Sequence, residues 1–147
     1  MLRRFFHFYW RFKRGMTLGV RGVVLRGNEV LLVRHGYTPG WHLPGGGVEP
    51  GESFEQALAK ELLEEGNVRV EGAPKLHGLF QNKHASARDH VAVYVVREFR
   101  YEGPPQPNFE IKESKFFPLD VLPEATTAAT RRRLAEVVEG KRPPAQW

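Results

Sequence analysis

The sequence contains no cysteine and no long apolar run, and each absence excludes a class of protein. Without cysteine there is neither a disulfide scaffold nor a zinc site built on thiolates, and the chain suits a reducing compartment, so we expect a cytoplasmic protein. Nothing approaches the roughly 18 consecutive apolar residues that a membrane-spanning helix needs. Internal repeats and low-complexity segments are also absent. The 147 residues, 41% of them hydrophobic, suffice for one globular domain with its own core.

Acidic residues are missing from the first 14 positions, where aromatic and basic side chains crowd together. A helix here would place Phe5, Phe8, Tyr9 and Phe12 on one face and Arg4, His7, Arg11 and Arg14 on another. The aromatic face would then cover the protein's own sheet or a homodimer partner, or it would lie on an anionic membrane or another acidic partner. A loose arm is the third alternative. A secretory signal is not expected, because aromatic residues and charges stand where an aliphatic core would be.

Alternating β-branched stretches predict a sheet, and two longer periodic stretches predict helices. We expect strands at 17–25, 29–33, 41–43, 68–70, 75–81, 90–99 and 110–119, and helices at 53–65 and 125–139. The last helix is expected to dock on the body through Leu134, Val137 and Val138. This order predicts an α/β fold with a mixed sheet and helices on its faces. The chain divides into a basic aromatic N-terminal segment at 1–15, a domain at 16–140 and a tail at 141–147.

The helix at 53–65 carries more acid than stability requires. Ser53 is a good N-cap and Gln56 completes a capping box, while Gly66 and Asn67 provide a left-handed stop. Glu61, Glu64 and Glu65 stand at i, i+3 and i+4, so they share one helix face and repel one another. The simplest interpretation is a solvated acidic face.

A glycine-rich loop in front of this helix favours a metal site instead. Residues 44–47 and 49–52 are expected to form two tight bends that expose backbone carbonyls and let another group approach closely. Hard divalent cations such as Mg²⁺ take carboxylate oxygens, with phosphate oxygens and water completing the shell. Carboxylates on one helix face beside such a loop meet that requirement.

Residues 46–68 resemble the Nudix box, Gly-x5-Glu-x7-Arg-Glu-U-x-Glu-Glu-x-Gly-U, where U is aliphatic. All fixed positions match except two, because Lys60 stands in place of arginine and Asn67 in place of the closing glycine. Asparagine tolerates a left-handed turn. Lysine keeps the charge of arginine but lacks its planar fork, so slower chemistry or altered metal affinity is expected. The resemblance covers nearly the whole chain, from about Met16 to Glu139, and implies the α/β/α sandwich of that family with a mixed central sheet.

The resemblance also implies a reaction and a set of residues. Nudix proteins hydrolyse a nucleoside diphosphate linked to another group, with water attacking phosphorus and Mg²⁺ or Mn²⁺ ions holding the oxygens. By this likeness the metal ligands are Glu61, Glu64, Glu65 and the Gly45 carbonyl. Glu52 supports the cluster, and Lys60 occupies the basic position of the box.

Residues outside the box are weaker candidates. Glu110 and Glu113 precede the last strand, where some family members hold a general base, and Glu110 is the preferred additional base or metal ligand. Lys83 and Arg88 are candidate phosphate ligands in a polar loop. Tyr37 and Trp41 are candidates for stacking on a nucleobase, although packing is the more usual role of such aromatics. His84 is expected to be a solvated loop residue, and His42 a pocket wall or structural residue.

The substrate is not specified by the sequence. Some Nudix subfamilies carry a proline or tyrosine beyond the box that marks ADP-ribose or diadenosine polyphosphate hydrolases, and residues 83–86 contain neither. The net charge of +5 favours an anionic partner, whether nucleotide, nucleic acid or acidic lipid. We therefore expect a pyrophosphohydrolase acting on a nucleoside diphosphate derivative or nucleoside triphosphate. Two alternatives stay open. One is a catalytically weak nucleotide-binding module, which Lys60 favours. The other is an RNA 5′-end pyrophosphohydrolase, suggested by the basic termini, including the arginines at 131–133, although a solvated helix face explains those arginines more simply.

Overall fold

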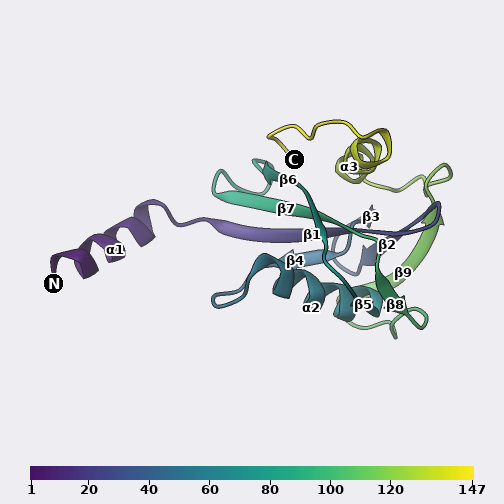
Figure 1. The fold of residues 1–147 in the computed structure, drawn as a ribbon, viewed down its shortest axis with the longest axis horizontal. Coiled ribbons are helices and arrows are strands. Elements are labelled where there is room, and N and C mark those ends of the chain that lie inside the picture. Colours follow the sequence, from purple (N-terminus) through teal and green to yellow (C-terminus); the bar gives the residue numbers. More distant parts are fainter.

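The computed structural model describes residues 1–147 and contains three helices and nine strands (Figure 1). The strands are β1 (Thr17–Arg26), β2 (Glu29–His35), β3 (Trp41–His42), β4 (Gly45–Gly47), β5 (Val68–Val70), β6 (Lys75–Gln81), β7 (Asp89–Val96), β8 (Phe99–Tyr101) and β9 (Ile111–Pro118). The helices are α1 (Leu2–Lys13), α2 (Phe54–Gly66) and α3 (Ala128–Glu139). The predicted elements are therefore all present, with shifts of a few residues at their ends.

Seven of the strands form one mixed sheet. Strands β3-β2-β1-β7-β6 lie in this order, while β4 also pairs with β1 and β9 with β2. The pair β1 and β7 is parallel, from Thr17 opposite Asp89 to Val24 opposite Val96, and the other pairs are antiparallel. Strands β5 and β8 form a separate two-stranded sheet.

Helices α2 and α3 cover opposite faces of the large sheet, each over its own apolar cluster (Figure 1). Strand β1 supplies both clusters, because successive side chains of a strand point to opposite faces. Val20 lies in the cluster with Leu62 of α2, and Val23 lies in the cluster with Leu134 of α3. These four side chains are at most 3% exposed. The expected sandwich of helix, mixed sheet and helix is confirmed.

Helix α2 begins and ends as its capping residues predict. The Ser53 hydroxyl accepts the Gln56 N–H at 3.1 Å, and the Gln56 side chain accepts the Ser53 N–H at 2.9 Å. Asn67 stops the helix in the left-handed conformation, with φ of 52°. Its side-chain amide also donates to the Gly103 carbonyl at 2.9 Å, so asparagine provides a tether that the usual glycine lacks.

Two predictions of local structure need correction, one of a tight bend and one of a strand. Residues 44–47, expected to bend tightly, include a short strand, β4, in which Gly46 lies opposite Val20 of β1. The predicted strand at 90–99 is interrupted at Arg97 and Glu98 and gives β7 and β8. The interruption has a physical reason, because β8 leaves the large sheet to pair with β5.

Helix α3 starts at Ala128, three residues later than expected, because the Thr127 hydroxyl caps it by accepting the Thr130 N–H at 3.3 Å. Leu134 docks on the body as predicted. The same prediction is wrong for Val138, which is 60% exposed. The docking surface is therefore narrower than the apolar residues of the helix suggest.

The expected solvated face at 131–133 is confirmed for Arg131 and Arg132, which are exposed, and is wrong for Arg133. Arg133 is fully buried, donates to the Glu136 carboxylate at 2.6 Å and lies 4.2 Å from the ring centre of Phe80. Arg131 donates to the Pro123 carbonyl at 2.7 Å, and Arg132 donates to the Trp147 carbonyl at 3.1 Å. All three guanidinium groups therefore hold segments of this protein together.

Helix α1 stands apart from the body, at the end of β1 (Figure 1). None of its residues is buried. The interpretation in which its aromatic face covers the protein's own sheet is therefore wrong. No helix of the structure has both the length and the apolar character to cross a membrane.

Candidate active site

The glycine strand β4 brings backbone against the acidic helix. Gly45 approaches β1 so closely that a Cβ would lie 2.0 Å from the Val20 carbonyl oxygen, and its φ is +152°. At Gly46 a Cβ would lie 2.6 to 2.7 Å from the carboxyl carbon and oxygens of Glu61. A side chain at Gly45 would collide with the backbone of β1, and a side chain at Gly46 would have to displace the Glu61 carboxylate.

Glu65 is the buried member of the acidic trio. One carboxylate oxygen accepts the Gly45 N–H at 2.9 Å, and the other accepts from His35 Nε2 at 3.0 Å. Only 7% of the residue is exposed. Glu65 therefore connects α2 to both β4 and β2.

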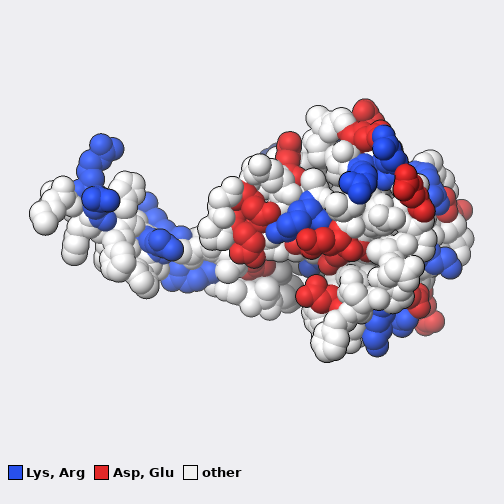
Figure 2. Space-filling model, turned by 90° about the horizontal axis from the view of Figure 1, so that it is seen from below, with Lys and Arg blue, Asp and Glu red and all other residues white.

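The carboxylates of the trio affect one another. Burial raises the pKa of Glu61, and the negative charges of Glu65 and Glu64 raise it further, while Lys60 and Arg21 oppose the shift. Seen from the side of α2, acidic side chains gather over this face of the body (Figure 2). Such a gathering is unfavourable unless a cation compensates it.

Lys60 performs part of the task of the arginine that it replaces. Its ammonium group donates to Glu52 at 3.0 Å and lies 3.9 Å from Glu61. This hydrogen bond lowers the pKa of Glu52 and raises the pKa of Lys60. The loop at 49–52 is thereby tied to α2, with one donor where an arginine fork would supply two.

The donor chemistry fits a hard divalent cation. Glu61, Glu64 and Glu65 supply carboxylates, and the adjacent Gly45 carbonyl supplies a backbone oxygen. The Gly45 carbonyl accepts from Arg21 at 3.3 Å, and both oxygens of Glu65 have partners inside the protein. No group of three acidic or histidine side chains already surrounds one point. Glu61 and Glu65 thus both lie against β4, but the three carboxylates do not yet converge on one metal position.

Arg21 is a functional candidate that the sequence did not suggest. Its Nη1 donates to the carbonyls of Leu43 and Gly45 at 3.1 and 3.3 Å. Two hollows, of about 160 and 280 Å³, share Arg21 and Trp147 in their walls, and the larger one also includes Gly46. We call them together the Arg21 cleft. A fixed positive charge beside the glycine strand is suited to an anionic substrate.

Trp147 closes the other side of the Arg21 cleft. Its ring packs edge-on against Phe80, with 5.7 Å between ring centres, and its backbone N–H donates to the Gln81 carbonyl at 3.1 Å. The segment at 141–147 is therefore anchored to the edge strand β6. Nothing in the spacing of the sequence indicates this contact, because it depends on the fold.

The predicted substrate residues lie in two separate places. Lys83 is exposed, and Arg88 donates to the Gly15 carbonyl at 2.6 Å at the base of α1. Tyr37 is 73% exposed and stacks on His35 with 5.4 Å between ring centres. Tyr37 and Trp41 both line a third hollow, near His35, but Trp41 is only 9% exposed and packs edge-on against Phe117. Trp41 is thus a core residue, which leaves Tyr37 as the accessible aromatic ring beside His35.

The two later glutamates differ in their surroundings. The backbone carbonyl of Glu110 accepts the Gly36 N–H at 2.8 Å, so this loop lies next to the strand end that carries His35. Glu113 instead pairs with Arg34 at 2.7 Å on the sheet surface. Glu110 is therefore the better placed of the two with respect to Glu65.

Two histidines also have defined places. His42 lines the Arg21 cleft, and burial lowers its pKa, with Arg21 and His35 acting in the same direction. This position matches the expected pocket wall. His84 is exposed, as expected for a loop residue.

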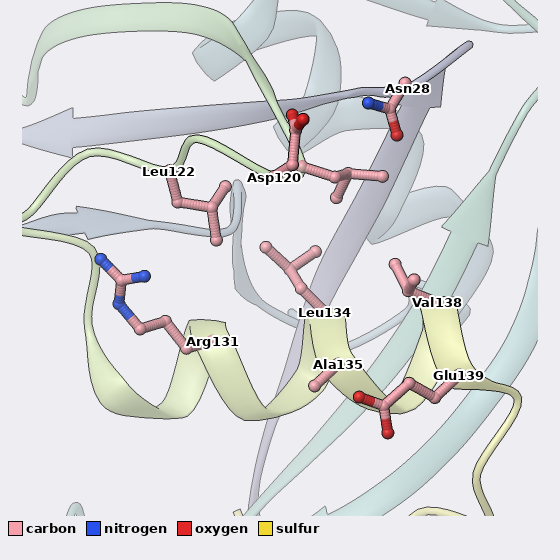
Figure 3. Close-up of a pocket in the computed structure, with 9 residues that line it drawn as sticks. Asn28, Asp120, Leu122, Arg131, Leu134, Ala135, Val138 and Glu139 are labelled. Carbon is pink, nitrogen blue, oxygen red and sulfur yellow. The ribbon is translucent and has the colours of Figure 1, made fainter.

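A further hollow of about 370 Å³ lies beneath α3, away from the glycine strand (Figure 3). Leu122, Leu134 and Val138 point toward it from the loop after β9 and from α3. Its one guanidinium group, that of Arg131, is engaged by loop carbonyls. With no residue of the glycine strand or acidic helix in its wall, this hollow is not the candidate site.

Comparisons with known proteins agree with this geometry. Residues 16–138 match the sequence profile of the NUDIX domain. The chain is 34% identical over 106 residues to the "Putative ADP-ribose pyrophosphatase YjhB" of Bacillus subtilis, covering 71% of this chain and 51% of that protein. It is 37% identical over 76 residues to a "Putative 8-oxo-dGTP diphosphatase" of the same organism, covering 51% of this chain and 50% of that protein. The chain thus spans about half the length of these curated relatives.

A solved structure shares the fold. The crystal structure of a MutT NUDIX hydrolase from Burkholderia pseudomallei superposes with a TM-score of 0.70 at 27% identity, covering 82% of this chain and 97% of that one. The part of this chain that superposes is therefore nearly the whole of that protein.

Proposed function

The chain belongs to the NUDIX family, and from that premise we propose that it is a pyrophosphohydrolase dependent on a divalent metal ion, Mg²⁺ or Mn²⁺. Its reaction is the cleavage of the diphosphate linkage of a nucleoside diphosphate derivative or nucleoside triphosphate, by attack of water on phosphorus. Relatives named for ADP-ribose and for 8-oxo-dGTP support this substrate class without choosing within it.

One observation carries the proposal: the Glu61 carboxylate lies against the bare backbone of Gly46, next to the Glu65 carboxylate that holds Gly45. A helix that needed only stability would not bury Glu65 and partly bury the like-charged Glu61 beside a glycine strand. Opposite charge from a metal ion explains why these carboxylates are kept together.

The metal ion, held by Glu61, Glu64, Glu65 and the Gly45 carbonyl, would supply charge neutralisation of the diphosphate and activation of water. The protein's own residues do the rest. Glu65 fixes the glycine strand, and the Lys60 hydrogen bond to Glu52 fixes the loop in front of α2. Positioning of this kind accounts for most of phosphoryl-transfer catalysis.

Arg21 is proposed to bind substrate phosphate in the Arg21 cleft, whose walls include Gly46 and Gly47 of β4 but no residue of α2. Its guanidinium group is already oriented by the carbonyls of Leu43 and Gly45, so little side-chain freedom is lost on binding. Either Trp147 or Tyr37 would then hold the nucleobase, and these two rings lie in different hollows. Alanine variants of each separate the two, because only the ring that stacks on the base should raise KM on removal.

Glu110 is proposed as the general base or an additional metal ligand, because its loop borders the strand end that carries His35. A Glu110→Gln variant should lower kcat more than it raises KM. Lys83 and Arg88 remain proposed substrate contacts, and the engagement of Arg88 with Gly15 makes Lys83 the freer of the two.

The test is a substrate panel with product analysis. Purified protein is incubated with ADP-ribose, UDP-sugars, dinucleoside polyphosphates, canonical and oxidised nucleoside triphosphates and capped RNA, with Mg²⁺, with Mn²⁺ and with EDTA. Hydrolysis in ¹⁸O water then shows which phosphorus is attacked.

Two variants supply the matched comparison. Glu61→Gln should lose activity by about 100-fold or more, as expected when a group acting in the transition state is removed. Glu55→Gln changes the same helix in the same way, but Glu55 is exposed in the first turn, outside the trio, so it should keep its activity. Full hydrolysis by Glu61→Gln, Glu64→Gln and Glu65→Gln with Mg²⁺ would contradict the proposal.

A catalytically weak nucleotide-binding module is the second candidate, and the single hydrogen bond of Lys60 favours it. Tight nucleotide binding without turnover, together with turnover gained in Lys60→Arg, would support this alternative. The RNA-end alternative now depends mainly on the basic N-terminal segment, because Arg133 is buried and the exposed Arg131 and Arg132 donate to backbone carbonyls of the protein.

A further inference from the structure

Helix α1 has two chemically distinct faces. At 100° per residue, its seven apolar and aromatic side chains, from Leu2 to Phe12, span an arc of about 200°. Arg3, Arg4, His7, Arg11 and Arg14 occupy the remaining arc, and Lys13 lies at the end of the helix within the apolar one. Helices with one broad apolar face and one cationic face adsorb in the plane of a membrane interface.

The net positive charge of the protein is located on this helix and its C-terminal cap residue. Five of the 22 lysine and arginine residues lie within residues 1–14, which hold no acid. The remaining 17 basic residues equal the 17 acidic residues, so the rest of the chain has a formal charge of zero. Figure 2 shows this contrast, with only basic charges on the arm and both signs on the body. The net charge of +5 is thus a property of the arm and not of the nucleotide cleft.

The apolar face of α1 has no partner within the protein. Phe5 and Phe12 are each 70% exposed and Phe8 is 62% exposed, although aromatic rings of this size normally bury most of their area. The arm is held only at its base, where Arg88 donates to the Gly15 carbonyl at 2.6 Å. The face is therefore free to contact another surface.

We propose that α1 lies flat on an anionic phospholipid bilayer, with its aromatic face inserted at the headgroup level and its basic face near lipid phosphates. Tyr9 and Trp10 are the residue types that concentrate at this depth, and Lys13 has the length to extend its ammonium group to water. Five basic residues without an acid complement a negatively charged leaflet.

Other occupants fit this helix less well. Two copies packed through α1 would bring ten like charges together with no acid in the segment to pair with them. Nucleic acid would contact the basic face and leave most of the aromatic arc exposed to water. A lipid surface is the one partner that satisfies both faces of the same helix.

The proposal also places the cleft. The Arg21 cleft includes Thr17 and Leu18, and Thr17 is the fourth residue after Lys13, where α1 ends. An extended chain of that length spans at most about 15 Å. Docking of α1 would therefore hold the cleft close to the membrane surface.

The experiment is flotation of the full chain with vesicles of phosphatidylcholine alone or mixed equally with phosphatidylglycerol. We expect flotation only with the anionic vesicles, loss of flotation at high salt, and a blue shift of tryptophan emission from Trp10. Phe5→Ala/Phe8→Ala/Phe12→Ala and Arg4→Glu/Arg11→Glu should each weaken binding by about tenfold or more. These variants should keep the melting temperature of the body, because α1 has no buried residue.

Arg69→Glu/Arg97→Glu is the matched control, because it changes the net charge by the same amount at two exposed positions of the body. It should bind vesicles as the unmodified chain does.

Equal loss in the control and the arm variants would overturn the proposal, and so would equal binding to neutral vesicles or no binding at all. A vesicle-free dimer that dissociates in the triple alanine variant would assign α1 to a second copy, and RNA binding lost in Arg4→Glu/Arg11→Glu without vesicle binding would assign it to nucleic acid. Hydrolysis of soluble substrate plays no part in these readouts, so the two proposals fail independently.

Discussion

Replacing Gly46 with alanine tests whether the placement of the Glu61 carboxylate matters for hydrolysis. The added Cβ would lie 2.6 Å from the Glu61 carboxyl carbon and 2.7 Å from both oxygens. Gly46 does not have positive φ, so alanine brings no backbone strain at this position. The substitution is thus a steric change aimed at one side chain.

The size of the effect follows from these distances. Non-bonded carbon atoms prefer separations of about 3.5–4.0 Å, so the carboxylate must move by about 1 Å. A misplacement of about 1 Å at an active site can cost about 100-fold in rate, which corresponds to about 2.7 kcal/mol. The stability of the fold should change by less than about 1.5 kcal/mol, because the atom that must yield is the end of a flexible side chain. Activity should therefore fall much further than stability.

The assay compares kcat/KM and the free energy of unfolding for Gly46→Ala and Gly47→Ala. Gly47 is the neighbouring residue in the same strand, and the nearest atom to its added Cβ would be Glu49 Oε1 at an ordinary 3.9 Å. We expect Gly47→Ala to keep kcat within about threefold, because its Cβ moves no catalytic group, with any larger change confined to KM, since Gly47 also lines the Arg21 cleft. Equal rates for the two variants would refute the reasoning. A second test places Gly46→Ala in a Glu61→Gln background, where it should have a smaller effect, because the effects of coupled residues are not additive. An unchanged effect of Gly46→Ala in that background would also refute the reasoning.

Four further expectations concern metal binding, pH dependence, the substrate and stability. Mn²⁺ at about 100 times its Kd should stabilise the fold by about 2.7 kcal/mol, and by less near pH 5, because the raised pKa of Glu61 lets a proton compete with the ion. Without metal, the same raised pKa makes the Glu61 contribution to stability fall as the pH rises through it, since the folded state then binds more protons than the unfolded chain. Arg21→Met should lower kcat/KM by about tenfold or more and destabilise the fold by about 1–3 kcal/mol through two unsatisfied carbonyls. Arg133→Met should lower the free energy of unfolding by about 3–5 kcal/mol, because Glu136 loses its buried guanidinium partner and keeps only the hydrogen bond with His77.

Calorimetry and kinetics check these expectations. Melting temperatures are measured with Mn²⁺ near pH 5 and at neutral pH, and Ca²⁺ at the same concentrations serves as the control for ionic strength. A Mn²⁺-induced shift in melting temperature that is the same at the two pH values would contradict the metal assignment. Arg21→Lys keeps the charge, so recovery of substrate affinity there supports a phosphate contact. For the buried pair, Arg133→Met/Glu136→Gln should regain part of the lost stability, and an Arg133→Met variant that melts like the unmodified chain would be the contrary result.

Local chemistry made α2 predictable. The capping box at Ser53 and Gln56 and the left-handed stop at Asn67 each depend on neighbours within a few residues, and all three form as expected. The placement of Glu61 and Glu65 on one side of the helix follows from the helical repeat alone. Their approach to a glycine segment was indicated by the spacing of the box.

Long-range contacts account for what the sequence did not indicate. Strand β4 consists of three glycines, which have low strand propensity and form a strand only because β1 pairs with them. Arg21 resembles a solvent-facing residue of an alternating strand until Leu43 and Gly45 present their carbonyls to it. Arginine side chains are usually exposed, but Arg133 is buried. Its guanidinium group lies over the ring of Phe80, which is distant in sequence, and pairs with Glu136 one turn further along α3.

The parallel pairing of β1 with β7 has a consequence for the order of folding. The two strands lie side by side although 72 residues separate Thr17 from Asp89, and the glycine strand and α2 lie within the connecting loop. Closing so long a loop costs chain entropy before any pairing offsets it, so this step is expected to follow the local β1–β2 hairpin. A nascent chain that has emerged only as far as residue 88 already contains all three glutamates of the trio and the entire acidic helix. The Arg21 cleft, the proposed substrate site, gains Asp89 and Val91 when β7 arrives and is closed only when Trp147 joins it, so it is expected to form late in the synthesis of this protein.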